Sequence, residues 1–238
     1  MPASLKTIFS KAEPSFGGKP LKVVRHASAR VMRLRVDPRD GAVRLTLPRR
    51  ASLRRAYAWV EEQRSWIEAQ LASRAPGRRF EPGGRLDVAS ETLTLVSAPE
   101  VRGARREAGE LRVGGDPDLF EIRVLRWLKA EARRVLEAET RSLARQAGVS
   151  IRRVSVGDTR SRWGSCSADG DIRYSWRLIL APPLVRLSTV AHEVAHRVHM
   201  NHGPAFRALE MQLLGESPAA ARAWLRAHGA SLHGYGRP

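Results

Sequence analysis

With 238 residues, 42% of them hydrophobic and 28% charged, the chain can bury the core of one globular domain or of two small ones. It has no run of about 18 apolar residues, which argues against a membrane span, and no apolar signal-peptide core near its start, which argues against secretion. Its single cysteine excludes an internal disulfide and favours a cytoplasmic location. The net charge of +18 favours a polyanionic partner such as nucleic acid, although the arginines that produce it are spread along the whole chain.

The N-terminal part is predicted to be rich in short strands. Residues 1–19 contain two prolines and two adjacent glycines and are predicted to form a flexible leader. Short apolar runs then alternate with turn residues, which predicts a β-meander. The runs occupy residues 21–24, 31–36 and 43–47. Ser52 can cap a following amphipathic helix that extends to about Ser73.

Short strands return between residues 80 and 113, separated by glycine and proline. The predicted strands are residues 85–88, 92–96 and 110–113. Asp116 followed by Pro117 suits the start of a helix, and Gly148 suits its end. We therefore expect a β-rich N-terminal region over residues 20–115 and a second domain over residues 116–238.

The C-terminal third combines predicted strands with helices. Residues 151–156 read as one strand, and residues 172–180 alternate apolar and polar side chains as a second strand would. Between them, Gly164 and Ser165 are predicted to form a tight turn. Pro182-Pro183 opens one helix and Gly203-Pro204 precedes the next.

The helix after the two prolines carries the segment His192-Glu-x-x-His196, and His202 follows six residues later. Two histidines four positions apart lie on one face of a helix and can bind one zinc ion, with Glu193 beside them. Catalytic zinc sites use three protein ligands and leave one position open for water. His202 suits the third position, because the asparagine, glycine and proline around it favour a chain reversal. The pattern predicts a hydrolytic site in which Glu193 takes a proton from zinc-bound water.

Two other side chains compete for the third ligand position. His199 lies close to the face of His196, but it is about 10.5 Å along the helix axis from His192, which one ion would bridge with difficulty. Glu210 lies one turn into the next helix and ranks below His202. The spacing also matches the metzincin motif, but His199 occupies the position of its glycine.

Cys166 and several arginines precede the metal-binding motif. Cys166 could be a fourth metal ligand, a redox switch or a small packed side chain, and packing is the common role of a free cysteine. Arg162, Arg173 and Arg177 could bind phosphate oxygens through their guanidinium groups. In a second interpretation, the edge of the strand over residues 172–180 pairs with an extended peptide. In a third, the arginines are simply solvated on the face of that strand.

Several motifs of this chain occur together in one known family. They are Arg162-Trp-Gly-Ser-Cys166, residues 172–180, Pro182-Pro183, His192-Glu-x-x-His196 and Asn201-His202-Gly-Pro-x-Phe206. In this combination they resemble the YgjP-like metallopeptidase family, which is related to the SprT-like and WLM zinc proteases. The resemblance is specific over about residues 150–215 and weaker over residues 21–71. It implies that His192, His196 and His202 bind zinc, that Glu193 is catalytic, and that the protein is bacterial and cytoplasmic.

We therefore expect an α+β fold with a β-rich N-terminal part and a zincin-like metal-binding domain at the C-terminus. A zinc-dependent metallopeptidase acting on a peptide or protein is the leading functional prediction. A nucleoside-triphosphate pyrophosphatase would use the same metal site, and such an activity on UTP is attached to one branch of the resembling family. A DNA-associated protease or a basic nucleic-acid-binding protein is a third possibility, motivated by the net charge of +18.

Overall fold

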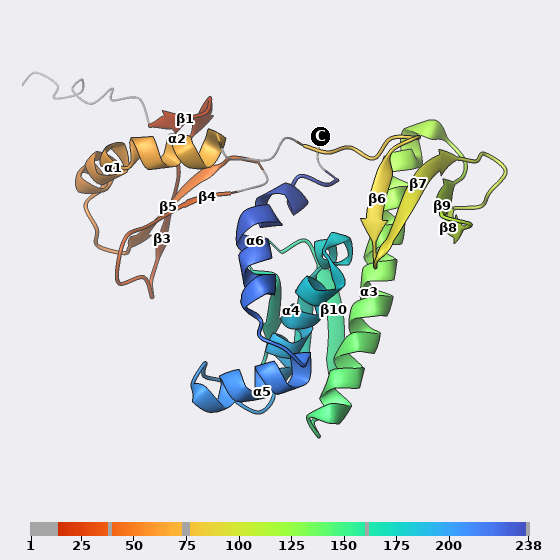
Figure 1. The fold of residues 1–238 in the computed structure, drawn as a ribbon. Coiled ribbons are helices and arrows are strands. Elements are labelled where there is room, and N and C mark those ends of the chain that lie inside the picture. Colours follow the sequence, from red (N-terminus) through yellow and green to blue (C-terminus); the bar gives the residue numbers. More distant parts are fainter. Residues whose placement is uncertain (1–13, 38–39, 73–76, 160–161, 237–238) are drawn as a thin grey trace, which may run out of the picture. The chain divides into compact units, whose positions relative to one another are not determined.

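The computed structural model describes residues 14–37, 40–72, 77–159 and 162–236, and the chain divides into two compact units, Met1–Arg74 and Ala75–Pro238. The described residues form helices and four small sheets, which confirms the predicted α+β class (Figure 1). None of the described helices has the length and apolar character that crossing a membrane requires.

The first unit contains a three-stranded sheet with β5 at its centre. Its strands are β3 (Lys22–His26), β5 (Val43–Pro48) and β4 (Arg33–Val36), in that order across the sheet. β5 runs parallel to β3 and antiparallel to β4. The predicted meander is therefore wrong, because a meander pairs each strand with the next one in sequence. β5 takes the central position because it alone places a fully buried side chain at every second position.

Two helices cover one side of this sheet (Figure 1). They are α1 (Leu53–Glu62) and α2 (Arg64–Ala72), separated at Gln63 where the sequence predicts one continuous helix. Ser52 caps α1 as predicted, its hydroxyl accepting a hydrogen bond from the Arg55 amide. Val60 and Ile67 are fully buried with the apolar side chains of β5.

Residues 15–20 form a small hairpin that overlaps the predicted leader. β1 (Ser15–Phe16) and β2 (Lys19–Pro20) pair antiparallel across Gly17 and Gly18, both of which have positive φ. Phe16 is buried in the core of the unit. Part of the predicted leader thus belongs to the first unit, and residues 1–13 lie outside the described residues.

The second unit begins with a four-stranded sheet packed against a long helix. Its strands are β6 (Arg85–Val88), β7 (Glu91–Ser97), β9 (Glu110–Val113) and β8 (Ala104–Glu107), in that order across the sheet. Three of the four strands are predicted from the sequence, and β8 is not. The short 3-10 helix η1 (Pro117–Leu119) is capped by Asp116 as expected and leads into α3 (Phe120–Gln146).

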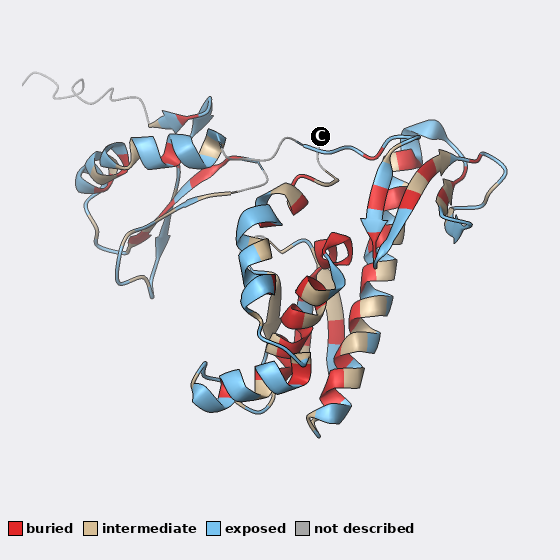
Figure 2. Cartoon of the chain, viewed as in Figure 1, coloured by how far each residue is buried: buried red, intermediate tan, exposed pale blue. Residues whose placement is uncertain are grey.

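The two units divide after Arg74, whereas the sequence places the division after residue 115. Leu93 and Leu111 of the four-stranded sheet belong to the same buried cluster as Phe120 and Val124 of α3. This cluster continues into the C-terminal elements, because α3 runs alongside both parts (Figures 1 and 2). A helix-start pattern locates the beginning of a helix but does not reveal which core that helix completes.

The rest of the second unit places a three-stranded sheet beside three helices. The strands are β10 (Arg153–Gly157), β12 (Asp171–Ser175) and β11 (Gly164–Cys166), with β12 in the centre, parallel to β10 and antiparallel to β11. The 3-10 helix η2 (Trp176–Leu180) follows β12, and then come α4 (Pro183–Ala195), α5 (Pro204–Leu214) and α6 (Ala219–Leu232).

Two local predictions are wrong in this region. The strand expected over residues 172–180 ends at Ser175, and residues 176–180 form η2, whose side chains are all buried. Alternation misleads here because Arg177, which it assigns to a solvated face, is buried and paired with Asp158. The tight turn expected at Gly164 and Ser165 is instead the edge strand β11, because both residues pair with β12.

Candidate metal centre

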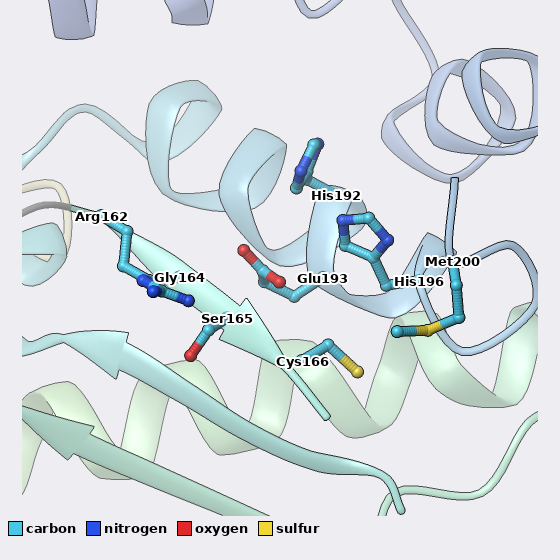
Figure 3. Close-up of a pocket in the computed structure, with 8 residues that line it drawn as sticks. All are labelled: Arg162, Gly164, Ser165, Cys166, His192, Glu193, His196 and Met200. Atoms are coloured by element: carbon cyan, nitrogen blue, oxygen red, sulfur yellow. The ribbon is translucent and has the colours of Figure 1, made fainter. Parts of the chain in front are cut away.

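The end of α4 presents the first residues of the site. His192 and Glu193 lie in its last turn, and His196 is the residue that caps its C-terminus. The opposite face of the helix is apolar and buried, with Val190 and Val194 fully inside the core. Burial of that face fixes the rotation of α4, so the two histidines and the glutamate between them point to the same side (Figure 3).

The chain then reverses and brings His202 back to the end of α4. The side-chain oxygen of Asn201 accepts a hydrogen bond from the Gly203 amide, and Pro204 begins α5. The Nε2 atoms of His192 and His202 are 3.2 Å apart. One ring nitrogen from each of His192, His196 and His202 lies within 4.8 Å of the other two. Such a set of three converging nitrogens could hold one metal ion.

The two rival ligands have other roles in the structure. Glu210 of α5 accepts a hydrogen bond from Nδ1 of His192 at 2.9 Å and also pairs with Arg222 of α6 at 2.6 Å. Among the described residues, His199 is not part of the converging group, and its carbonyl oxygen accepts a hydrogen bond from Nδ1 of His196 at 3.2 Å. Both interactions fix an imidazole ring and leave Nε2 free, which is how metal-binding histidines are commonly oriented.

Phe206 packs against all three imidazoles. Its ring centroid lies 5.0 Å from that of His192 and 4.7 Å from those of His196 and His202. The side chain is fully buried. Phe206 therefore restricts the positions of the three rings by packing against each of them. Sequence reasoning missed this role. The pairing of Glu210 with Arg222 was also missed, and no local pattern signals either contact.

Glu193 is buried beside these rings, and the residue is only 5% exposed. Desolvation raises the pKa of Glu193 to about 7, although the charge of Arg162 opposes this effect, and Glu210 adds a smaller increase. Desolvation also lowers the pKa of His192, against the hydrogen bond from its ring to Glu210, and lowers the pKa of His196. Both rings are thus held in the neutral form that binds metal ions.

Gly164 of β11 makes room for the Glu193 side chain. A Cβ atom at position 164 would lie 2.8 Å from the carboxyl carbon of Glu193 and 2.7 Å from its Cγ. Real Cβ atoms essentially never approach other heavy atoms so closely. A larger residue at position 164 would therefore force the Glu193 side chain to shift. The constraint is steric and does not come from the backbone, because the φ of Gly164 is not in the left-handed region.

A cavity of about 340 Å³ opens in front of these residues. It is lined by Arg162, Gly164, Ser165, Cys166, His192, Glu193, His196 and Met200 (Figure 3). Of the three arginines singled out in the sequence, the structure brings only Arg162 to this cavity. The side chain of Arg177 is buried, pairs with Asp158 and donates a hydrogen bond to the Tyr235 carbonyl.

Cys166 is half-buried at the edge of the cavity. Its thiol contacts the Ser167 carbonyl at 3.4 Å, and it does not belong to the converging ligand group of the described residues. Burial raises the pKa of the Cys166 thiol, with Arg197 opposing the effect. This placement supports the packing role, because burial favours the protonated thiol over the thiolate that binds metals.

Comparison with known proteins gives one match. A family model described as "YgjP-like, metallopeptidase domain" matches residues 30–228, which is most of the chain and includes every residue of the candidate metal centre. The comparisons with curated proteins and with solved structures found no match.

Proposed function

Because this chain belongs to the YgjP-like metallopeptidase family, we propose that it is a zinc-dependent peptidase. In this proposal His192, His196 and His202 bind the ion, and Glu193 acts as general base and general acid. The observation that carries the proposal is the convergence of three imidazole nitrogens within 4.8 Å beside a buried carboxyl group.

The donor set fits zinc well. Three imidazole nitrogens suit a borderline-soft ion in a catalytic site, whereas calcium and magnesium prefer oxygen ligands. The ring of His192 is oriented by Glu210, and that carboxylate is held by Arg222, so the donor atoms are positioned in advance. When bound, zinc would lower the pKa of a coordinated water and polarise a substrate carbonyl.

The residues of the chain itself supply the proton transfers. The Glu193 carboxylate accepts a proton from the attacking water and returns it to the leaving amine. Its position is restricted by Gly164 on one side and by the packed end of α4 on the other. Arg162 lines the same cavity, and its charge acts on Glu193. The guanidinium can stabilise the oxyanion that develops on the scissile carbonyl.

An extended peptide is the substrate shape that the cavity suits best. Among the described residues, β11 pairs only with β12, so its other edge has free backbone donors and acceptors beside the metal centre. A peptide that adds a strand to this edge would lie across Glu193. A nucleoside triphosphate fits less well, because Arg162 is the single arginine that lines the cavity in the described part of the chain.

Metal removal tests the proposal directly. We expect the purified protein to contain about one zinc per chain and to cleave casein or an unstructured peptide library. Treatment with a chelator should abolish cleavage, and addition of one equivalent of zinc should restore it, while magnesium should not. A protein that retains full cleavage after complete zinc removal would contradict the proposal. So would a zinc-loaded protein that hydrolyses UTP and leaves every peptide intact.

Replacing Gly164 by alanine is expected to lower kcat for peptide cleavage by about 100-fold, because displacement of Glu193 by about an ångström removes its alignment with the water. Zinc content should stay at the wild-type level, since none of the three converging nitrogens comes from position 164. Ser165→Ala, a change at the next residue of the same strand, is the control and should keep kcat within a few-fold. An unchanged kcat in Gly164→Ala would contradict this prediction, because it would show that catalysis does not depend on the close packing of Glu193 against position 164.

A further inference from the structure

The sheet of the first unit has one face that the helices do not cover. The apolar side chains of the sheet point to α1 and α2. The side chains at the alternate positions of all three strands point away from these helices, on the uncovered face. Lys22, Arg44 and Arg35 lie directly opposite one another in one row across the strands. Arg33 lies opposite Thr46 in the next row. We call Lys22, Arg33, Arg35 and Arg44 the basic face, and all four are exposed.

The basic face has little acidic compensation. Among the described residues, Arg33, Arg35 and Arg44 have no ion-pair partner, and the ion pairs in this unit join Arg64 to Glu61 and Glu68 on the helices. Two carboxylates, Asp37 and Asp40, lie in the connection between β4 and β5, next to the row of Lys22, Arg35 and Arg44. The pKa of Asp40 is lowered, because the Ala42 amide and the charges of Lys19 and Lys22 outweigh the opposing effect of desolvation. The four cations of the basic face outnumber these two carboxylates, so the face keeps an excess of positive charge.

This arrangement does not serve folding. Neighbouring strands lie about 4.8 Å apart, and like charges directly opposite each other destabilise a sheet. The core of the unit is already complete on the other face, where Val43, Leu45 and Leu47 are buried. A row of three cations that opposes folding needs another explanation, and an anionic partner would remove the repulsion between them.

We propose that the basic face binds the phosphate backbone of duplex DNA without reading its sequence. Guanidinium groups match phosphate oxygens, and phosphate contacts supply most of non-specific DNA affinity. The face has the chemistry for a duplex rather than a single strand, because its described side chains include no Phe, Tyr or Trp ring on which bases could stack, and its one imidazole, that of His26, lies at the end of β3 in contact with the Ser28 hydroxyl.

Other polyanions suit this face less well. Recognition of duplex RNA depends on contacts to 2′-hydroxyl groups, and the face offers one hydroxyl, that of the half-buried Thr46. An anionic membrane would favour apolar side chains that enter the interface, and Val24 is the one exposed aliphatic side chain among those of the described strands on this face. The proposal concerns the first unit and does not depend on the peptidase activity assigned to the second.

The test compares two triple variants of the full-length protein with the same change in net charge. The first is Arg33→Gln, Arg35→Gln and Arg44→Gln on the basic face. The second is Arg85→Gln, Arg102→Gln and Arg126→Gln, three exposed arginines of the second unit that have no ion-pair partner among the described residues. Binding of a fluorescent 20-base-pair DNA is measured by anisotropy from 50 to 300 mM salt, and thermal unfolding is followed by circular dichroism.

The basic-face variant should bind DNA about tenfold or more weakly at 100 mM salt, and the slope of log K against log salt should fall by about 2 to 3. Its Tm should be unchanged or higher, because like charges have been removed. The control variant should stay within about threefold of the wild type. Equal losses in both variants would overturn the proposal, since only bulk charge would then matter. Tighter binding to duplex RNA, or to phosphatidylserine vesicles, than to DNA would overturn it as well.

Discussion

Replacing Glu193 by glutamine is expected to lower kcat for peptide cleavage about a thousandfold while zinc content stays at the wild-type level. Glutamine keeps the shape of the side chain, so the tight fit against Gly164 is preserved. It cannot accept a proton from water, so the general-base step is lost. The three converging nitrogens come from other residues, and the ligand set is therefore intact. Steady-state kinetics and metal analysis on the same preparation measure the two effects separately.

Glu216→Gln provides the matched control, because Glu216 is exposed and has no ion-pair partner among the described residues. It should cleave peptides at the wild-type rate. If Glu193→Gln retained more than about a tenth of wild-type kcat, the general-base role would have to pass to another group, and Glu193 would be a packing residue. If the variant lost its zinc, the carboxylate would belong to the ligand set instead.

The parts of the site that the sequence predicts are those governed by local spacing. The helical repeat alone places His192 and His196 on one face of α4 with Glu193 beside them. The chain reversal that returns His202 follows from the residues around it, because Asn201 precedes it and Gly203 and Pro204 follow it. The start of α4 at Pro183 and the capping by Ser52 and Asp116 are equally local. These features need no information about distant parts of the chain.

The parts that the sequence does not predict depend on distant segments. Gly164 contacts Glu193 across 29 positions, and nothing near residue 164 in the sequence indicates that its missing side chain serves a carboxyl group on another element. Arg222 reaches Glu210 from a separate helix. Arg177 has the polarity of a surface residue and yet is buried against Asp158. The predicted order of the strands in the first sheet is wrong for the same reason. Burial of β5 against the helices places it between β3 and β4, so the strands are not arranged in the order of the sequence.

Replacing His202 by alanine is expected to lower zinc affinity by more than about 100-fold and to reduce peptide cleavage to background at equimolar zinc. Loss of a residue that merely orients a ligand costs roughly 10- to 100-fold in metal affinity, so loss of a ligand itself should cost more. The backbone near position 202 should tolerate the change, because His202 is exposed and the turn is held by Asn201 and Pro204.

His199→Ala is the matched control for this prediction, since it removes a second histidine from the same short segment. Its imidazole lies outside the converging group, and the contact with His196 uses its backbone carbonyl, which alanine retains. Zinc affinity should therefore remain within a few-fold of the wild type when both variants are titrated against a competing chelator. If His199→Ala lost zinc and His202→Ala kept it, the third ligand would be His199, and the loop between α4 and α5 would have to rearrange on metal binding. The pair of variants thus distinguishes the loss of a metal ligand from the loss of any histidine in this segment.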